Sequence, residues 1–161
     1  MRTIPENSID PIWTRLNESP PDEIRQKFEK LGKAQPFIVA YMLAVEETLM
    51  AEGDRGNLLF LTLIIHEIMS AARPRLQQIT GEVLESAESA NTQFLENLEA
   101  GSEIGYIDAL SKLVATYNQM PLLGAVLEAL MAGNEEEPEL ADENLGMALI
   151  HLKTVIDCLD Q

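Results

Sequence analysis

Apolar residues recur along this chain at intervals of three and four positions, the spacing that places them on one face of an α-helix. The clearest case is the stretch 75–100, whose apolar set is Leu76, Ile79, Val83, Leu84, Ala87, Ala90, Phe94, Leu95 and Leu98. Gly81 and the small polar residues between Ser86 and Thr92 weaken this pattern. The stretch is therefore predicted as one long helix or as two helices with a break near Ser89.

Prolines and capping residues mark two helices near the N-terminus. Asp10 followed by Pro11 has the form of an N-cap and a first helical residue, and it predicts a short helix with three residues facing inward, namely Ile12, Trp13 and Leu16. Residues 1–18 would form either part of the domain or a peripheral arm. The run Ser19-Pro20-Pro21-Asp22 repeats the device and predicts a second helix, which we expect to end at Gly32 in a left-handed cap.

Two strongly apolar segments follow. The first is predicted as a helix from Pro36 to about Glu52, ended by Gly53, with Glu46 and Glu47 on the outside. Its inward-facing set at helical spacing is Phe37, Ile38, Tyr41, Met42, Val45 and Leu49. The second segment runs from about Arg55 to Ala72 with Asp54 as its cap, and it is apolar all round in its first half, which predicts the central helix. A buried strand over 58–65 is the competing interpretation, but the pattern continues through Ile68 and Met69 and favours a helix.

The remainder of the chain predicts three further helices. The first follows Gly101, the second begins at Met120-Pro121 and ends at Gly133, and the last follows an acidic linker over 134–139. Strand signals are almost absent, because aromatic residues make up only 5% of the chain. Short connections favour antiparallel neighbours. We therefore predict a single all-α domain over 1–161, built as a compact bundle of about seven helices or as stacked helical hairpins.

The charge of the chain limits its partners. Eleven Lys and Arg stand against 27 Asp and Glu, which gives a net charge of −16 at pH 7. Binding to a nucleic-acid backbone or to an anionic membrane surface is not expected, because both need clusters of basic residues. The net charge is −2 over 1–50, −5 over 51–100 and −9 over 101–161, and the basic residues cluster in the first part as Arg25, Lys27, Lys30 and Lys33. This layout predicts either a solvated surface or one that orients self-association or a basic partner.

The location is predicted to be cytoplasmic. Cys158 is the single cysteine, so no intramolecular disulfide forms, and the N-terminal residues lack the apolar core of a secretory signal. The longest apolar run, 58–65, is far shorter than the roughly 20 residues that cross a bilayer. Asp157 and Asp160 flank Cys158 and disfavour a reactive thiolate, so we expect this cysteine to be a small buried apolar residue.

His66 and Glu67 are the weak candidates for catalysis. A zinc site of the His-Glu-x-x-His type would need a second histidine at position 70, which is Ser70. The other histidine, His151, has no glutamate three residues before it, so the paired di-iron motif is missing too. No metal or cofactor is predicted. An acid–base site would require His66 to meet carboxylates from neighbouring helices, the candidates being Glu46, Glu47, Glu82, Glu85 and Glu88. The simpler interpretation is a hydrogen-bonded histidine at the edge of the core and an exposed acidic face.

Three functions remain compatible with the sequence. The first is a non-catalytic, adaptor-like interaction domain that forms homo-oligomers or binds a protein partner, through an apolar groove or through its acidic C-terminal third. Ile12 and Trp13 are its candidate anchors, unless they fold onto the domain as a lid. The second is a metal-dependent or acid–base enzyme that uses His66 with Glu67 and Glu46 or Glu47. The third is an acidic decoy that imitates nucleic acid. An enzyme is the less favoured class.

Overall fold

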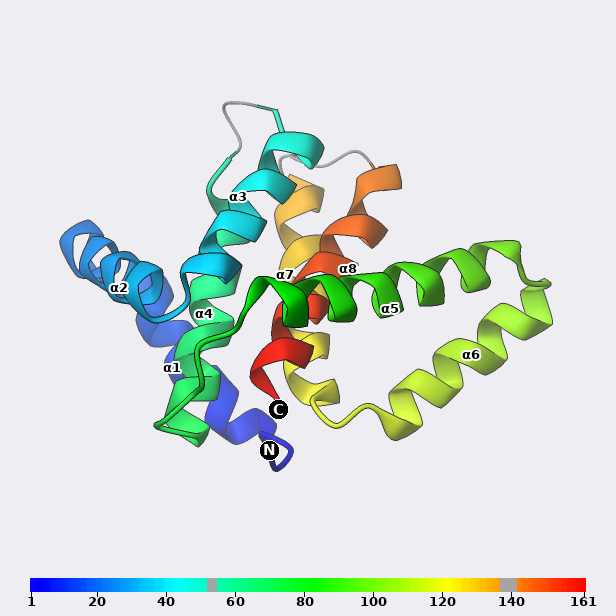
Figure 1. Cartoon of the computed structure of the whole chain (residues 1–161), viewed down its shortest axis with the longest axis horizontal. Coiled ribbons are helices and arrows are strands. Elements are labelled where there is room, and N and C mark those ends of the chain that lie inside the picture. The colour runs from blue at the N-terminus through cyan, green and yellow to red at the C-terminus, as the bar shows by residue number, and fades with distance from the viewer. Residues whose placement is uncertain (52–54, 137–141) are drawn as a thin grey trace.

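The chain folds into helices alone over the residues that the structure, a computed structural model, describes: 1–51, 55–136 and 142–161, with the side chains of 98–100, 103–107, 109–110, 133–136 and 142–143 left aside. This confirms the predicted all-α class. In chain order the helices are α1 (Glu6–Glu18), α2 (Pro21–Ala34), α3 (Pro36–Leu49), α4 (Asn57–Ala72), α5 (Gly81–Ala100), α6 (Glu103–Thr116), α7 (Met120–Glu136) and α8 (Asp142–Leu159) (Figure 1).

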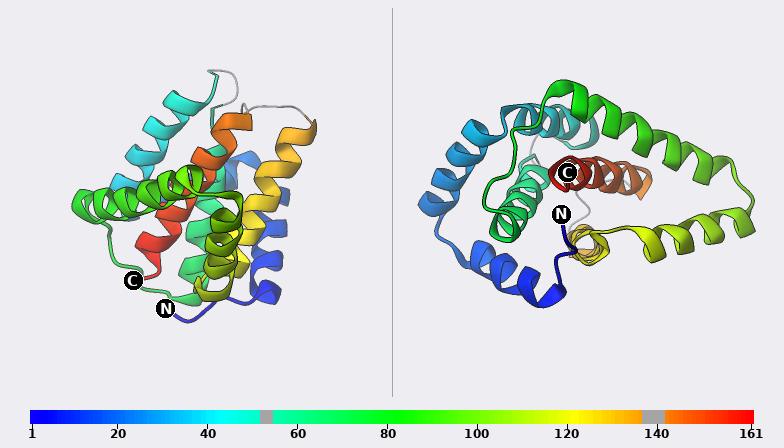
Figure 2. Two further views of the ribbon diagram at one scale, coloured as in Figure 1. Left: turned by 90° about the vertical axis from the view of Figure 1, so that its right-hand side faces the viewer. Right: turned by 60° about the horizontal axis from the view of Figure 1, so that its bottom comes forward.

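Two helices, α4 and α8, form the centre of the molecule. α4 is buried along most of its length, as its all-round apolar character predicts. The second half of α8 is equally enclosed, because from Ala148 to Leu159 every residue except Leu149 and Asp157 is buried. α8 packs against α3, α4, α5 and α7, and the right-hand view of Figure 2 shows it surrounded by the other helices. The core is therefore built around a pair of helices, not around α4 alone.

The first helix begins earlier than Asp10-Pro11 predicts. α1 starts at Glu6, after an extended Pro5, and Pro11 lies inside it. Proline has the backbone φ of a helix, and Pro11 is exposed, so its missing N–H bond falls on the outer side. The segment before α1 is held by the Gln119 side chain, which accepts the Ile4 N–H at 3.1 Å and donates to the Arg2 carbonyl at 3.2 Å. Residues 1–18 are thereby joined to the core, in which Ile4, Ile9 and Leu16 are buried.

Glycines end fewer helices than the sequence predicts. α2 continues past Gly32 to Ala34, and α7 continues past Gly133 to Glu136. The corner between α2 and α3 is formed instead by Gln35, whose buried side chain accepts the Ile79 N–H at 2.9 Å and donates to the Gln77 carbonyl at 2.8 Å. Among the described residues, positive φ occurs at Gly56 (117°), immediately before α4. The predicted roles of Gly53 and Asp54, and of linker residues 137–139, fall outside the described residues.

The stretch 75–100 contains one unbroken helix that begins only at Gly81. Leu76 and Ile79 belong to the extended connection before it, where Ile79 still reaches the core. α5 then crosses α8, and α6 returns from its far end to form a hairpin that projects from the body (Figures 1 and 2). None of the helices in the described ranges is long and apolar enough to cross a bilayer.

Candidate functional site

His66 and Glu67, adjacent on α4, are engaged separately. The His66 ring lies with Nε2 3.4 Å from the Ser70 hydroxyl, while its buried Nδ1 has no hydrogen-bond partner. Burial lowers the pKa of His66, because the imidazolium form loses hydration. The Glu67 carboxylate instead accepts the Lys27 ammonium of α2 at 2.6 Å. His66 is thus a core-edge histidine as expected, although only one of its two nitrogens has a partner.

The carboxylates that an acid–base site would require point to different places. Glu46 was expected outside and is buried, since its Oε1 accepts the N–H groups of Gly56 and Leu59 at the start of α4, at 3.0 and 2.9 Å. Glu47 is exposed, as are Glu82 and Glu85. Within the described part of the chain, no group of three or more His, Cys, Asp or Glu residues is placed to hold a metal ion.

A first polar cluster joins α3, α5 and α8. The Tyr41 hydroxyl lies 2.5 Å from His151 Nδ1, and Glu88 Oε1 lies 3.6 Å from the same nitrogen. Burial lowers the pKa of His151 against the opposing effect of Glu88, and burial together with Glu88 raises the pKa of Tyr41. Both shifts favour the neutral imidazole and the neutral phenol, which share one hydrogen bond. No sequence pattern indicates this cluster, since its three members are far apart in the chain.

A second polar cluster fastens α5 to α8. The Lys153 ammonium donates to Asp157 at 2.7 Å and to Asn91 at 2.8 Å, and Asn91 donates to Asp157 at 2.8 Å. The Tyr117 hydroxyl donates to the other Asp157 oxygen at 2.7 Å, and its ring centroid lies 4.5 Å from the ammonium. Burial raises the pKa of Tyr117, with Asp157 adding to the effect. Thr154 completes the cluster by accepting from Asn91 at 3.1 Å.

These clusters hold helices together and offer little for catalysis. A hollow of about 460 Å³ reaches Asp157 from outside, and its lining contains Glu82 and Ser86 but no histidine, cysteine or lysine. Cys158 is fully buried next to it, and burial raises the pKa of its thiol to about 11. The expected role of Cys158 as a small buried apolar residue is confirmed.

The exposed apolar residues point to a different surface. Among the described residues, the large apolar side chains with half or more of their area exposed are Phe37 (52%), Leu43 (50%), Val114 (58%) and Met131 (50%). Ile12 and Trp13, the candidate anchors, are partly buried against the core, which agrees with the alternative that they fold onto the domain, and Ile12 lines a hollow of about 570 Å³ beside the N-terminal segment.

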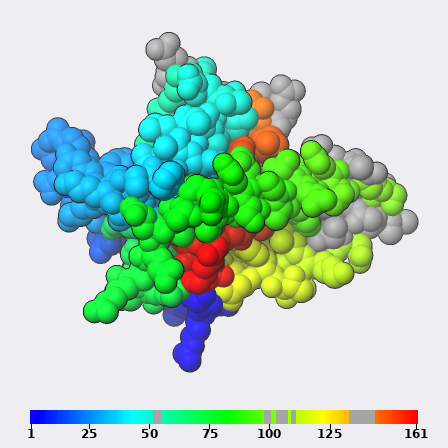
Figure 3. All heavy atoms as spheres, in the orientation of Figure 1, coloured from blue at the N-terminus to red at the C-terminus, as the bar shows by residue number. Residues whose placement is uncertain are grey.

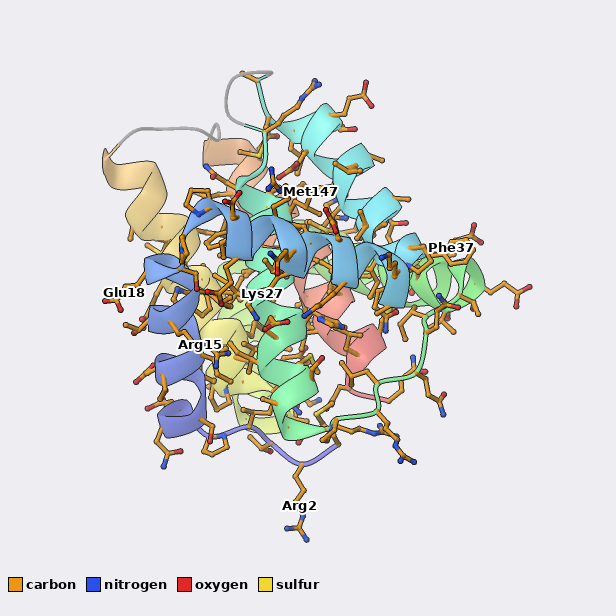
Figure 4. The ribbon with its side chains drawn as sticks, turned by 90° about the vertical axis from the view of Figure 1, so that its left-hand side faces the viewer. Arg2, Arg15, Glu18, Lys27, Phe37 and Met147 are labelled. Atoms are coloured by element: carbon orange, nitrogen blue, oxygen red, sulfur yellow. The ribbon has the colours of Figure 1, made fainter. Side chains whose placement is uncertain are left out.

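Two of these exposed residues share the outer side of α3, which we call the α3 face: Pro36, Phe37, Ala40, Leu43 and Ala44. None of its members is polar, and the first charged residue along this side is Glu47, in the last turn. In Figure 3, α3 (cyan) covers the upper part of the visible surface above the ridge of α5. Figure 4 shows Phe37 at the edge where α2 ends and where α3 and α5 begin. Gly81, the first residue of α5, adjoins one edge of the Phe37 ring. A Cβ added to Gly81 would lie 3.8 Å from that edge.

Phe37 was predicted to face inward, and the reason that it does not is geometric. α3 is apolar on all sides from Pro36 to Val45. Its inner side, with Ile38, Met42 and Val45 buried, packs against α4 and α8. The opposite side is left exposed, apart from the edge of the Phe37 ring that adjoins Gly81. The sequence feature that could have indicated this exposed side is the lack of charged residues over 36–45. The same lack of charge in the first half of α4 predicted that helix to be central.

No family model, curated protein or solved structure matches this chain.

Proposed function

We propose that this chain is a non-catalytic protein-interaction domain and that the α3 face is the surface with which it contacts another protein chain. The observation that carries the proposal is an exposed helix side without a polar group for more than two turns, on a protein whose net charge is −16. Contiguous exposed apolar surface on a soluble protein commonly marks an interaction site. The cytoplasmic location and the formation of homo-oligomers, both inferred from the sequence, remain predictions.

The residue types on the α3 face suit a helix-in-groove or helix-on-helix contact. Phe37 supplies an aromatic anchor of the kind that concentrates binding energy, and Leu43 lies almost two turns further along the same side. Burying the exposed half of each side chain is worth about 1 kcal/mol. Ala40, which lies between these two residues, and Ala44, which follows Leu43, are small and allow a partner backbone to approach closely.

The alternative of an acid–base enzyme is less favoured by the geometry. Such an enzyme would need His66 beside a free carboxylate, whereas Glu67 is paired with Lys27 and Glu46 with the start of α4. The decoy alternative would need two rows of surface carboxylates. Exposed carboxylates occur on several helices, for example Glu6 on α1, Glu23 on α2 and Glu82 on α5, so the decoy stays a prediction from the sequence.

The proposal is tested by purifying three tagged proteins from the native host: the wild type, Leu43→Glu and Ser89→Glu. Both variants add one negative charge at an exposed helical position, so Ser89→Glu on α5 is the matched control. The co-purifying chain is then identified and its affinity for each purified protein is measured by calorimetry. We expect Leu43→Glu to weaken binding at least about tenfold and Ser89→Glu to leave it unchanged. Equal binding by all three, or no bound chain together with a wild type that is monomeric at every concentration, would overturn the proposal.

A further inference from the structure

We propose that the α3 face pairs with the same face of a second copy of this chain, antiparallel about a two-fold axis that passes next to Ala40. This inference rests on the proposed function and names its partner. Most soluble oligomers are homo-oligomers, and a two-fold interface requires a surface complementary to itself. The α3 face meets that requirement in the size of its residues and in the charges at its two ends.

The side chains along the face complement one another by size. In an antiparallel pair centred on position 40, the numbers of facing residues add up to 80. Phe37 then meets Leu43 of the partner subunit, and Pro36 meets Ala44 of the partner subunit. Ala40 meets its own counterpart at the axis, where both helices are smallest. Alanine at this crossing permits helix axes about 8 Å apart, the close end of the usual range.

The charged groups at the two ends are complementary in the same arrangement. Lys33, exposed in the last turn of α2, lies just before α3, and Glu47 is exposed at the other end. The antiparallel pairing therefore brings the end of the α3 face next to Lys33 against the end that carries Glu47 of the partner subunit, twice in each dimer. Antiparallel packing also places each helix N-terminus near a C-terminus, which favours the helix dipoles. A parallel pair would bring Glu47 against Glu47 of the partner subunit.

The remaining charges near the ends agree with this direction. Glu82 and Glu85, exposed in the first turns of α5, lie on the Phe37 side, where Gly81 adjoins the ring. Arg55 lies at the opposite end, with its guanidinium 3.5 Å from the Glu47 carbonyl. The two-fold arrangement therefore brings Arg55 of the partner subunit to the end that carries Glu82 and Glu85. Each end of the α3 face thus carries both positive and negative side chains. The antiparallel pairing places groups of opposite charge near one another.

The dimer is expected to be weak and to strengthen with salt. One helix pair buries less than the roughly 1,600 Å² of a standard interface, so we expect micromolar or weaker affinity. Two bodies that each carry a net charge of −16 repel at long range, and this repulsion is screened once the Debye length falls to about 10 Å, near 0.1 M salt. A complex between the acidic surface and a basic partner would respond to salt in the opposite direction.

Sedimentation velocity over a range of protein concentrations tests the pairing. We expect the wild-type mass to rise from 17.9 kDa toward twice that value, and the same for Ser89→Glu, while Leu43→Glu stays monomeric. Lys33→Glu and Glu47→Lys should each weaken the dimer severalfold, since each breaks two exposed pairs. Lys33→Glu combined with Glu47→Lys has the net charge of the wild type and should restore the dimer. Failure of this double variant to recover would contradict the antiparallel direction.

A cysteine at the axis provides a second, geometric test. Helix axes about 8–10 Å apart bring facing Cα atoms to within about 6 Å, close enough for a disulfide. Ala40→Cys should therefore form a covalent dimer under mild oxidation, whereas Ser89→Cys should not. The native Cys158 is fully buried and does not compete. A wild type that is monomeric at every concentration, or the absence of a cross-link through Ala40→Cys, would overturn this inference. If Leu43→Glu still lost a different protein partner, the proposed function would stand without it.

Discussion

The carboxylate of Glu46, near the end of α3, accepts the backbone N–H of Leu59 in the first turn of α4 at 2.9 Å. The same oxygen accepts the N–H of Gly56, and only 2% of Glu46 is exposed. Gly56 is the N-cap of α4 and has no side chain to serve the first N–H groups. A glutamate ten residues earlier performs this role and adds a negative charge where the helix dipole favours one. This contact ties the end of α3 to the start of α4.

Replacing Glu46 is therefore expected to destabilise the fold. Glu46→Ala leaves two N–H groups at the start of α4 without their acceptor, and we expect the free energy of unfolding to fall by about 2–3 kcal/mol. Glu46→Gln keeps an acceptor oxygen but loses the charge, so it should cost less than half as much. Urea denaturation of the three proteins measures the difference. Equal stability of Glu46→Ala and the exposed control Glu47→Ala would contradict this role.

The second polar cluster predicts an asymmetric response to mutation. Asp157→Ala leaves the Lys153 ammonium without its counter-charge in a largely buried position and should reduce the free energy of unfolding by about 2–4 kcal/mol. Combining Lys153→Met with Asp157→Asn removes both charges, keeps an oxygen that accepts from Tyr117, and should recover part of that loss. Asp22→Ala, which breaks the exposed pair with Arg25, is the control and should have little effect. A double variant as unstable as Asp157→Ala would show that the charges do not act as a pair.

Acid should destabilise the protein partly through its histidines. The pKa of His66 is lowered in the folded state, so below about pH 6.5 the unfolded chain binds a proton that the folded chain does not. This contribution to stability is complete above pH 6.5 and is lost as the pH falls. His66→Leu also removes an unpaired buried nitrogen. We expect the variant to be as stable as the wild type at pH 7.5 and to lose up to about 1.4 kcal/mol less on going to pH 5.5.

Chemical denaturation of both proteins at the two pH values measures this difference. His151 is retained in the variant and has a lowered pKa as well, so some acid sensitivity remains. Parallel pH profiles of wild type and His66→Leu would contradict the assignment.

The thiol of Cys158 should be inert in the folded protein. It is fully buried, and its pKa is raised to about 11 by burial, with Asp157 adding to the effect, so almost no thiolate forms at pH 8. A thiol reagent should react with it in denaturant and at least about a hundredfold more slowly under native conditions. Rapid native labelling would mean that the C-terminal end of α8 opens readily, and it would remove the basis for the cysteine test at Ala40.

Local pattern was enough to predict the helical class and the approximate position of most helices, because period and proline placement act within a few residues. It failed where a distant group decides the outcome. Glu46 was placed outside by its spacing, but the start of α4 draws it inward. Gly32 does not end α2, because the corner is formed by Gln35 and its bonds to 77–79. Helical spacing gives the faces of a helix but not which of two apolar sides finds a neighbour, and this is why Phe37 was misplaced.

The candidate site was predictable only in part. The lack of a second ligand near His66 was visible in the sequence, since it depends on spacing within one helix. The cluster at His151 combines residues from three helices, and the cluster at Asp157 combines two helices with the connection between α6 and α7, so no local pattern indicates them. The anchors expected at Ile12 and Trp13 were chosen by residue type, whereas exposure is decided by how α1 packs on the core.

The most direct test of the α3 face is photo-crosslinking inside the native host. A photoreactive phenylalanine analogue replaces Leu43 in one protein and the exposed Ser89 in the other, and the products are identified by mass spectrometry. We predict a discrete adduct with a second protein chain, either another copy or a different protein, from position 43 and none from position 89. No adduct from position 43, or the same products from both positions, would contradict the account.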